Sequence, residues 1–146
     1  MAGSARALVH CFRCVYTWRP RGHRVRICPR CKSKLWNVPR IKPKSMRPTG
    51  LGTDKIIQPH IRRIRPLAAR FEVSRIRVFG SVARGEATAV SDVDLLFESE
   101  TPLGLLRRAE FKEELETILG RSVDLCREES LKWYVRAQAL ADAVAL

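Results

Sequence analysis

The chain has 146 residues, and its 28 Lys and Arg against 15 Asp and Glu give a formal net charge of +13 at pH 7. No apolar run is long enough to span a membrane, and no apolar secretory segment lies near Met1. These features argue against membrane-spanning and secreted proteins, so we expect a cytoplasmic protein without a membrane partner.

The excess of positive over negative charge is confined to the first third of the chain. Residues 1–52 contain 13 Lys and Arg and no Asp or Glu, whereas residues 53–146 contain 15 basic and 15 acidic residues. This asymmetry predicts a small basic module and a neutral one of about 90 residues, which is large enough to bury its own core. We expect a zinc ribbon over 1–38, a basic linker rich in Pro and Gly over 39–53, and the larger domain over 54–146.

Four cysteines explain how so small a first module can fold. Cys11 and Cys14 form one pair, Cys28 and Cys31 form another, and 13 residues separate the two pairs. This spacing is typical of two knuckles that share one tetrahedral, structural Zn²⁺. Disulfides are the alternative, but they do not suit a reducing compartment.

Three other residues are of types that often bind metal ions, but we do not expect them to do so here. His10 and His23 are expected at the surface, because four thiolates already complete a structural zinc site. Cys126 ends a predicted strand, so we expect a small, buried apolar residue without special reactivity.

Basic and aromatic side chains lie between and after the cysteine pairs. Because arginines bind phosphates and aromatic rings stack on bases, DNA or RNA is the partner expected for residues 1–52. An acidic protein partner and a solubilising surface are alternatives, and Trp18 and Trp36 can equally serve to cover the knuckles. The residues concerned are Tyr16, Trp18, Arg19, Arg21, Arg24, Arg26, Arg30, Lys32, Lys34 and Trp36.

The second module alternates helical and strand patterns, which favours an α/β (α+β) fold, a small mixed sheet flanked by helices. Helices are expected over 55–71, where Pro59 and Pro66 start, kink or divide the helix, after Gly80, from Thr101-Pro102 to Leu119, and over 129–146. Strands are expected over 74–79, 92–98 and 121–126. The inward residues are expected to be Leu103, Leu106, Phe111, Leu115 and Ile118 in the third helix, and Trp133, Ala137, Leu140 and Val144 in the last.

The most informative motif joins a Gly-Ser turn to two acids ten residues further along the chain. Gly80 permits a tight turn that lets backbone N–H groups approach a ligand, and Ser81 adds a hydroxyl donor. Side chains alternate along a strand, so Asp92 and Asp94 are expected on one face. Such paired carboxylates repel unless a cation lies between them, and Mg²⁺ takes one or two carboxylates plus substrate phosphates. Asp124, in a later short apolar strand, is the candidate third carboxylate.

These residues together resemble the minimal nucleotidyltransferases of the DNA polymerase beta superfamily, over roughly residues 55–146. The resemblance implies that Gly80 and Ser81 contact the nucleotide phosphates. It also implies that two catalytic Mg²⁺ ions are held by Asp92, Asp94 and Asp124. Arg84 lies where the family has a basic residue that binds nucleotide, although an ion pair with Glu86 or a packing role is the alternative.

The family members that this chain resembles most are antitoxin partners of HEPN-domain ribonuclease toxins. The resemblance therefore implies transfer of AMP from ATP to a tyrosine of a HEPN-type toxin by a Mg-dependent nucleotidyltransferase. We expect another molecule to present the acceptor, because only one predicted helix follows Asp124. The alternatives are a non-catalytic, nucleic-acid-binding regulator that uses this fold as a scaffold, and an enzyme that modifies a small molecule.

Overall fold

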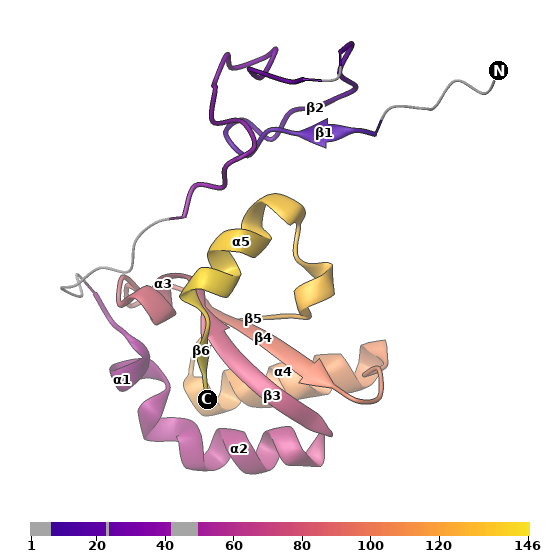
Figure 1. Ribbon diagram of the computed structural model, residues 1–146. Helices are drawn as coiled ribbons and strands as arrows, with labels where there is room; N and C mark the ends of the chain where they lie inside the picture. The colour runs from indigo at the N-terminus through magenta and orange to yellow at the C-terminus, as the bar shows by residue number, and fades with distance from the viewer. Residues whose placement is uncertain (1–6, 23, 42–49) are drawn as a thin grey trace. The chain divides into compact units, whose positions relative to one another are not determined.

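The computed structural model of the protein describes residues 7–22, 24–41 and 50–146. The chain divides into two compact units, residues 1–42 and 43–146, which we describe separately (Figure 1). His23 and most of the expected linker lie outside the described residues. None of the helices within those ranges has the length and apolar character that crossing a membrane requires.

The first unit, which we call the N-terminal ribbon, is a small hairpin with long irregular loops. Strand β1 (Val9–His10) pairs antiparallel with β2 (Thr17–Trp18), and Val9 lies opposite Trp18. Turns and loops make up the other described residues of the unit, including both cysteine pairs. With so little regular structure and so few buried residues, this unit needs a covalent or metal crosslink to stay folded.

The second unit is built on a mixed sheet with the strand order β5-β4-β3-β6. Strand β3 (Val73–Phe79) runs antiparallel to β4 (Val93–Ser99) and to the short β6 (Val144–Ala145). Strand β5 (Val123–Cys126) runs parallel to β4. The expected mixed-sheet fold class is therefore confirmed (Figure 1).

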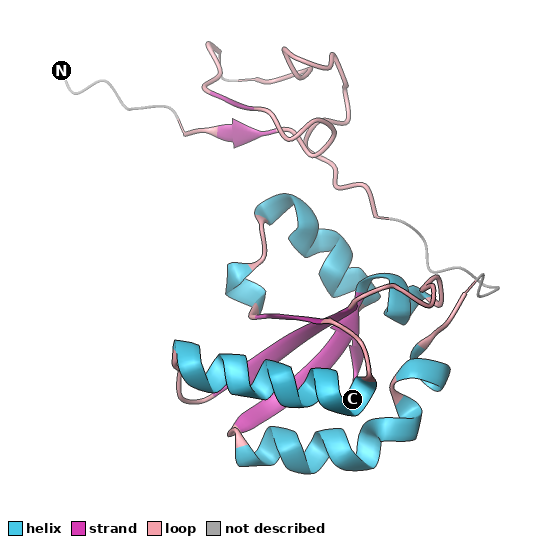
Figure 2. Cartoon of the chain, turned by 180° about the vertical axis from the view of Figure 1, so that it is seen from behind, coloured by secondary structure: helices cyan, strands magenta, loops and turns pink. Residues whose placement is uncertain are grey.

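Helices cover both faces of this sheet (Figure 2). Helix α2 (Ile61–Arg70) and helix α4 (Leu105–Leu119) pack on one face, and α5 (Trp133–Asp142) packs on the other. The remaining helices are the short α1 (Thr53–Ile56), η1 (Gln58–His60), α3 (Gly80–Arg84) and η2 (Glu128–Ser130).

The alternation of side chains along β4 decides which face holds the site. Val93 and Leu95 enter the main core with Phe111 of α4, while Leu96 joins Phe79 and Ala139 on the opposite face. Each fully buried Leu or Phe in these clusters contributes about 1.5–3 kcal/mol to folding. Asp94 alternates with Val93 and Leu95, so it shares the face of Leu96 that α5 covers.

The predicted start of α4 was wrong. Thr101 and Pro102 do not cap the helix, because the Thr101 hydroxyl donates a hydrogen bond to Glu72 (3.0 Å) and the helix begins at Leu105. Leu106, expected inside, is 79% exposed, whereas Phe111 and Leu115 are fully buried as expected. The end of the helix was predicted correctly, because Gly120 has a φ of 63° and its N–H donates to the carbonyl of Glu116.

The prediction of one helix from 129 to 146 was also wrong. Helix α5 ends at Asp142, and the apolar residues after it form the edge strand β6 beside β3. There the N–H of Leu146 donates to the carbonyl of Ile76 (3.0 Å), and Leu146 packs on the main core. Ala139 is the buried apolar residue of α5, and Leu140, expected inside, is 37% exposed. Packing on an existing sheet thus outweighed the helical propensity of this segment.

The segment with two prolines forms three short pieces in place of one helix. Pro59 lies in η1, at a position where its missing N–H costs nothing, and α2 begins at Ile61. Pro66 lies inside α2 without ending it. Pro66 and Arg62, four residues earlier, are both exposed, so water can bond the carbonyl that lost its partner.

Candidate active site and four-cysteine cluster

The Gly-Ser turn is built against an acidic side chain. Strand β3 ends at Phe79 and α3 begins at Gly80, which has a φ of 70°. A Cβ atom on Gly80 would lie 2.3 Å from Oδ2 of Asp94, well inside van der Waals contact. Glycine is therefore favoured here by its backbone conformation, and a side chain at this position would have to displace the Asp94 carboxylate.

The sheet register brings two of the three predicted acids together. Asp94 of β4 and Asp124 of β5 are paired neighbours in parallel strands, which places their backbones about 4.8 Å apart with both side chains on one face. Asp92 lies in the loop that enters β4 and is exposed. The prediction that Asp92 lies in this strand was therefore wrong, because β4 begins at the next residue, Val93.

Electrostatic coupling links the three acids. The pKa of Asp94 is raised from 3.8 to about 6. Burial is the largest cause, the charges of Asp124 and Asp92 act in the same direction, and the charge of Arg84 lowers the pKa. In the described part of the chain these acids do not form a group as compact as the four cysteines, as expected for carboxylates that repel each other. A cation between them would relieve the repulsion, so the donor set fits a divalent, oxygen-preferring metal ion.

Arg84 forms a network that the sequence did not reveal. Its guanidinium donates to Glu86 (2.8 Å), which is the ion pair named as the alternative in the sequence analysis. It also donates to Asp142 of α5, which is only 2% exposed. Gln138 donates to the other oxygen of Asp142 (2.7 Å). These bonds tie α3, and with it the Gly-Ser turn, to α5. The nucleotide-binding role of Arg84 stays a prediction.

Arg121 holds the loop that carries Asp92. Its guanidinium donates to the carbonyls of Thr88 (3.0 Å), Ala89 (2.8 Å) and Ser91 (3.3 Å). The Ser91 hydroxyl also accepts a hydrogen bond from the N–H of Thr88 (2.9 Å). Such anchoring limits the positions open to the next residue, Asp92. No sequence motif marks Arg121 for this task, because its partners are backbone carbonyls 30 to 33 residues away.

Cys126 is half-buried and packs against the smaller core cluster. Burial and the charge of Asp124 raise the pKa of its thiol to about 11. The thiol is therefore protonated and unreactive near neutral pH, as the sequence suggested.

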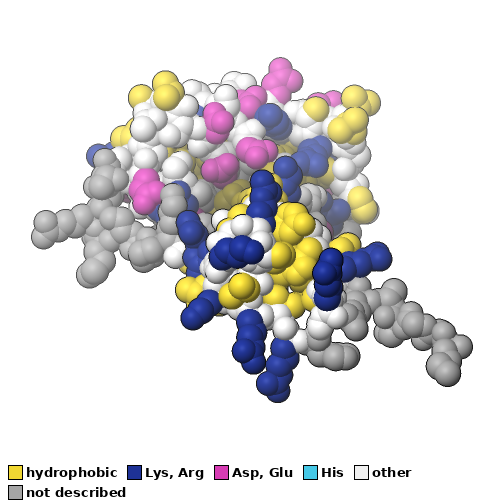
Figure 3. Space-filling view, turned by 90° about the horizontal axis from the view of Figure 1, so that it is seen from above, with side chains coloured by type: hydrophobic (Ala, Val, Ile, Leu, Met, Phe, Trp, Pro, Cys, Tyr) yellow, Lys and Arg dark blue, Asp and Glu magenta, His cyan; other side chains and the backbone are white. Residues whose placement is uncertain are grey.

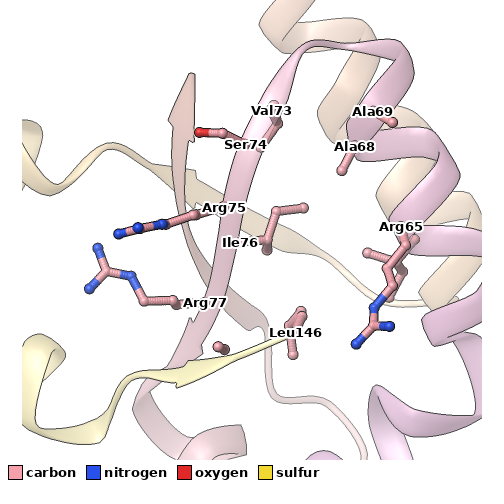
Figure 4. A pocket seen from close by; sticks show the side chains of 11 residues that line it. Arg65, Ala68, Ala69, Val73, Ser74, Arg75, Ile76, Arg77 and Leu146 are labelled. Atoms are coloured by element: carbon pink, nitrogen blue, oxygen red, sulfur yellow. The ribbon is translucent and has the colours of Figure 1, made fainter. Parts of the chain in front are cut away.

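Two surface hollows of the second unit differ in their relation to the acids. A hollow of about 220 Å³ borders Asp124 and is lined by Leu105, Arg108 and Lys112 of α4. A larger hollow of about 550 Å³ lies between α2 and the edge of β3, where Figure 4 shows Arg65 across from Ile76 and Leu146. None of the predicted site residues lines this larger hollow.

The four cysteines of the N-terminal ribbon converge on one point. Their sulfur atoms all lie within 4.8 Å of one another, and the Sγ atoms of Cys11 and Cys31, and of Cys14 and Cys28, are 3.7 Å apart. A tetrahedral Zn²⁺ with bonds of about 2.3 Å places its sulfurs about 3.8 Å apart, whereas a disulfide needs about 2.05 Å. The geometry therefore fits a metal ion better than disulfides.

The two cysteine pairs have the same local structure. In each knuckle, the N–H of the residue after the second cysteine donates to the carbonyl of the first, from Val15 to Cys11 and from Lys32 to Cys28 (both 2.9 Å). Val15 and Lys32 both have positive φ, 61° and 58°, which L-residues rarely adopt. A strained conformation repeated in both knuckles indicates a shared geometric demand, that of two sulfurs on one centre. His10 donates to or accepts from Thr17 (2.9 Å) through Nδ1 and is not among the clustered ligands.

Comparison with known proteins matches the second unit. Residues 61–146 match the family model described as Nucleotidyltransferase domain. Protein adenylyltransferase MntA of Thermococcus cleftensis is 41% identical over 91 residues, which cover 62% of this chain and 89% of that protein. A minimal nucleotidyltransferase of known structure is 39% identical and has a TM-score of 0.56, over 67% of this chain and 99% of the other. A toxin-antitoxin complex with AMP-PNP, 23% identical, matches in fold with a TM-score of 0.51, over 57% of this chain and 69% of the other.

Proposed function

Because the chain belongs to the nucleotidyltransferase domain family, we propose that it transfers AMP from ATP to a hydroxyl group of a partner protein. The observation that carries this proposal is the contact between the Gly80 turn and the carboxylate of Asp94, with Asp124 beside it in register. A fold used only as a scaffold gains nothing from adjacent, mutually repelling acids. The name of the MntA relative, a protein adenylyltransferase, supports AMP as the transferred group and protein as the acceptor.

Each residue of the site has a proposed role. Asp92, Asp94 and Asp124 hold two Mg²⁺ ions, and the backbone of Gly80 and the hydroxyl of Ser81 position the triphosphate. When bound, Mg²⁺ neutralises the phosphate charge and lowers the pKa of the attacking hydroxyl. Asp124, which is exposed on strand β5, is the carboxylate proposed to take the proton of that hydroxyl.

The acceptor is proposed to be a HEPN-type toxin. Its hydroxyl attacks the α-phosphorus of ATP, the bond to the bridging oxygen breaks, and pyrophosphate leaves. The hollow that borders Asp124 offers a surface for the partner, with Arg108 and Lys112 as cationic groups and Leu105, 85% exposed, as an apolar one. This arrangement suits a partner segment that combines acidic and apolar side chains.

For the N-terminal ribbon we propose one structural Zn²⁺ held by Cys11, Cys14, Cys28 and Cys31. Four thiolates leave no open position on a tetrahedral ion, so this site has no role in the transfer. We place the protein in the cytoplasm, where ATP is available and thiols stay reduced.

Two labels of ATP test the transfer. The protein, Mg²⁺ and a HEPN-domain protein from the same genome are incubated with ATP labelled at the α-phosphate or, separately, at the γ-phosphate. We expect label on the partner only from the α-position, lost in Asp92→Asn and kept in the exposed control Asp54→Asn. Label from the γ-position would indicate a kinase. ATP binding without transfer to any acceptor would favour the non-catalytic regulator.

A further inference from the structure

The N-terminal ribbon contains an open hollow of about 580 Å³, and none of the residues proposed for the transfer lines it. Two aromatic residues, Tyr16 and Trp18, line it together with basic ones. The basic residues that matter for the argument are Arg19, Arg24, Arg26 and Lys32, and all four are exposed.

The two aromatic rings form a parallel stack at this hollow, which we call the aromatic platform. The rings of Tyr16 and Trp18 are nearly parallel, with an interplanar angle of 10° and centroids 6.0 Å apart. Trp18 is fixed from behind by the edge of Trp36 at 5.3 Å, and Trp36 is itself held by its indole N–H, which donates to the carbonyl of Val25 (3.3 Å). Trp36 is thus a structural support, whereas Tyr16, 38% exposed, offers its ring to solvent.

The charged side chains around the platform are basic. Residues 1–52 contain no Asp or Glu, so no carboxylate of the ribbon offsets its arginines and lysines. The guanidinium of Arg30 lies 5.8 Å from the centre of the Tyr16 ring. Figure 3 shows Lys and Arg side chains around the apolar side chains of this unit. A ligand that satisfies both features must combine regularly spaced negative charge with flat, apolar faces.

We propose that the N-terminal ribbon binds single-stranded nucleic acid, with unpaired bases stacked on Tyr16 and Trp18 and the phosphates bound by the surrounding Arg and Lys. Only an unpaired base can lay its face on an exposed ring, because in a duplex that face is covered by the next base pair. The described part of the ribbon has no helix, and its strands have two residues each, so it lacks the elements that enter a major groove. Sequence preference is therefore weak. This binding site is separate from the transfer site and does not depend on the proposed transfer.

Fluorescence anisotropy with the full-length, zinc-loaded protein tests the proposal. The probes are labelled dT12, U12 and a 12-base-pair DNA duplex, each measured between 50 and 300 mM salt. Tyr16→Ala should weaken binding to dT12 and U12 about 5- to 100-fold, and Tyr16→Phe should bind like the wild type because stacking does not need the hydroxyl. Arg24→Ala and Arg26→Ala should each reduce the slope of log K against log salt by about 0.7.

Matched controls separate this site from general attraction to a basic protein. Arg62→Ala, an exposed arginine of α2, removes the same charge from the other unit and should leave both affinity and salt slope unchanged. Unchanged zinc content in each variant shows that the ribbon is folded. Stronger binding to dT12 than to U12 or the reverse identifies DNA or RNA as the better ligand, and both results support the site.

Three results would overturn the proposal. The first is binding of dT12 and U12 by Tyr16→Ala as tight as that by Tyr16→Phe. The second is binding of the duplex as tight as that of the single strands, with no dependence on Tyr16. A polyglutamate peptide that binds as tightly as dT12, with the same loss in Tyr16→Ala, would instead assign the surface to an acidic protein partner.

Discussion

Asp94→Asn should stabilise the second unit at neutral pH while abolishing transfer of AMP. The carboxylate is partly buried and faces the charges of Asp124 and Asp92, so its ionised form is disfavoured in the folded protein. Asparagine keeps the shape of the side chain and removes the charge. The proposed reaction thus uses a residue whose charge destabilises the fold.

The size of this cost follows from the pKa. A rise from 3.8 to about 6 is about two pKa units, which corresponds to about 3 kcal/mol at 1.36 kcal/mol per unit. Solvent screens a side chain that is only partly buried, so we expect a measured gain of about 1–2 kcal/mol. A carboxyl with a higher pKa in the folded state binds its proton more tightly there. The penalty is therefore complete above about pH 6, falls as the pH drops towards 3.8, and is absent below.

Urea denaturation followed by circular dichroism at 222 nm measures the effect, because the described helices all lie within residues 53–142. Without added divalent cation, Asp94→Asn should gain about 1–2 kcal/mol at pH 8 and about a third of that at pH 4.5. Glu113→Gln, an exposed acid on α4, is the control and should change stability by less than about 0.5 kcal/mol at both pH values. Mg²⁺ should narrow the gap, because it binds the wild type better. A variant that is no more stable than the wild type at pH 8, or that gains as much at pH 4.5, would refute this account.

Three further variants test separate parts of the structure. Gly80→Ala should destabilise the second unit by about 1–3 kcal/mol and abolish transfer. The control Gly120→Ala is also at positive φ but has nothing within 4 Å of its Cβ, so it should lose stability and keep transfer. Equal transfer by the two variants in the labelled-ATP assay would contradict the contact with Asp94. Arg84→Met should cost about 3 kcal/mol in thermal denaturation because it leaves the buried carboxylate of Asp142 without its cationic partner, and adding Asp142→Asn should restore much of this. A raised KM for ATP at unchanged stability would show instead that Arg84 binds nucleotide. Val15→Gly should relieve the strain of a positive φ, so the free energy of zinc binding, measured by competition with a chelator, should become more favourable by about 1 kcal/mol. Weaker zinc retention would show that the Val15 side chain stabilises the ribbon by more than its backbone conformation costs.

Local patterns predicted the central part of the second unit well. The alternation around Ile76 and around Leu95 fixed strands β3 and β4 to within one residue at each end, because period-two burial is a property of the strand itself. The C-terminal segment was not predictable in this way. Val144 fits the apolar stripe of a helix and the interior of a strand equally well, and the free edge of β3, distant in sequence, decided between the two.

The same division applies to the candidate site. Gly80, Ser81, Asp92, Asp94 and Asp124 could be proposed from residue type and spacing, since phosphate and metal binding favour such residues. Arg121 and Asp142 are not, because a guanidinium bound to backbone carbonyls and an acid buried under an arginine carry no spacing signal. Both act on the position of other groups, and only the folded chain shows which groups those are.

By itself, the sequence determined the two-module charge pattern, the spacing of the four cysteines and the types of residue at the proposed transfer site. Each of these depends on residue chemistry and short spacing, which the order of residues states directly. The tertiary structure alone decided that Asp94 and Asp124 are neighbours, that the Asp94 carboxylate fills the space a side chain on residue 80 would need, and that the chain after α5 returns as a strand. These outcomes depend on sheet register and packing between segments far apart in the chain, where the free energy of burial outweighs local preference.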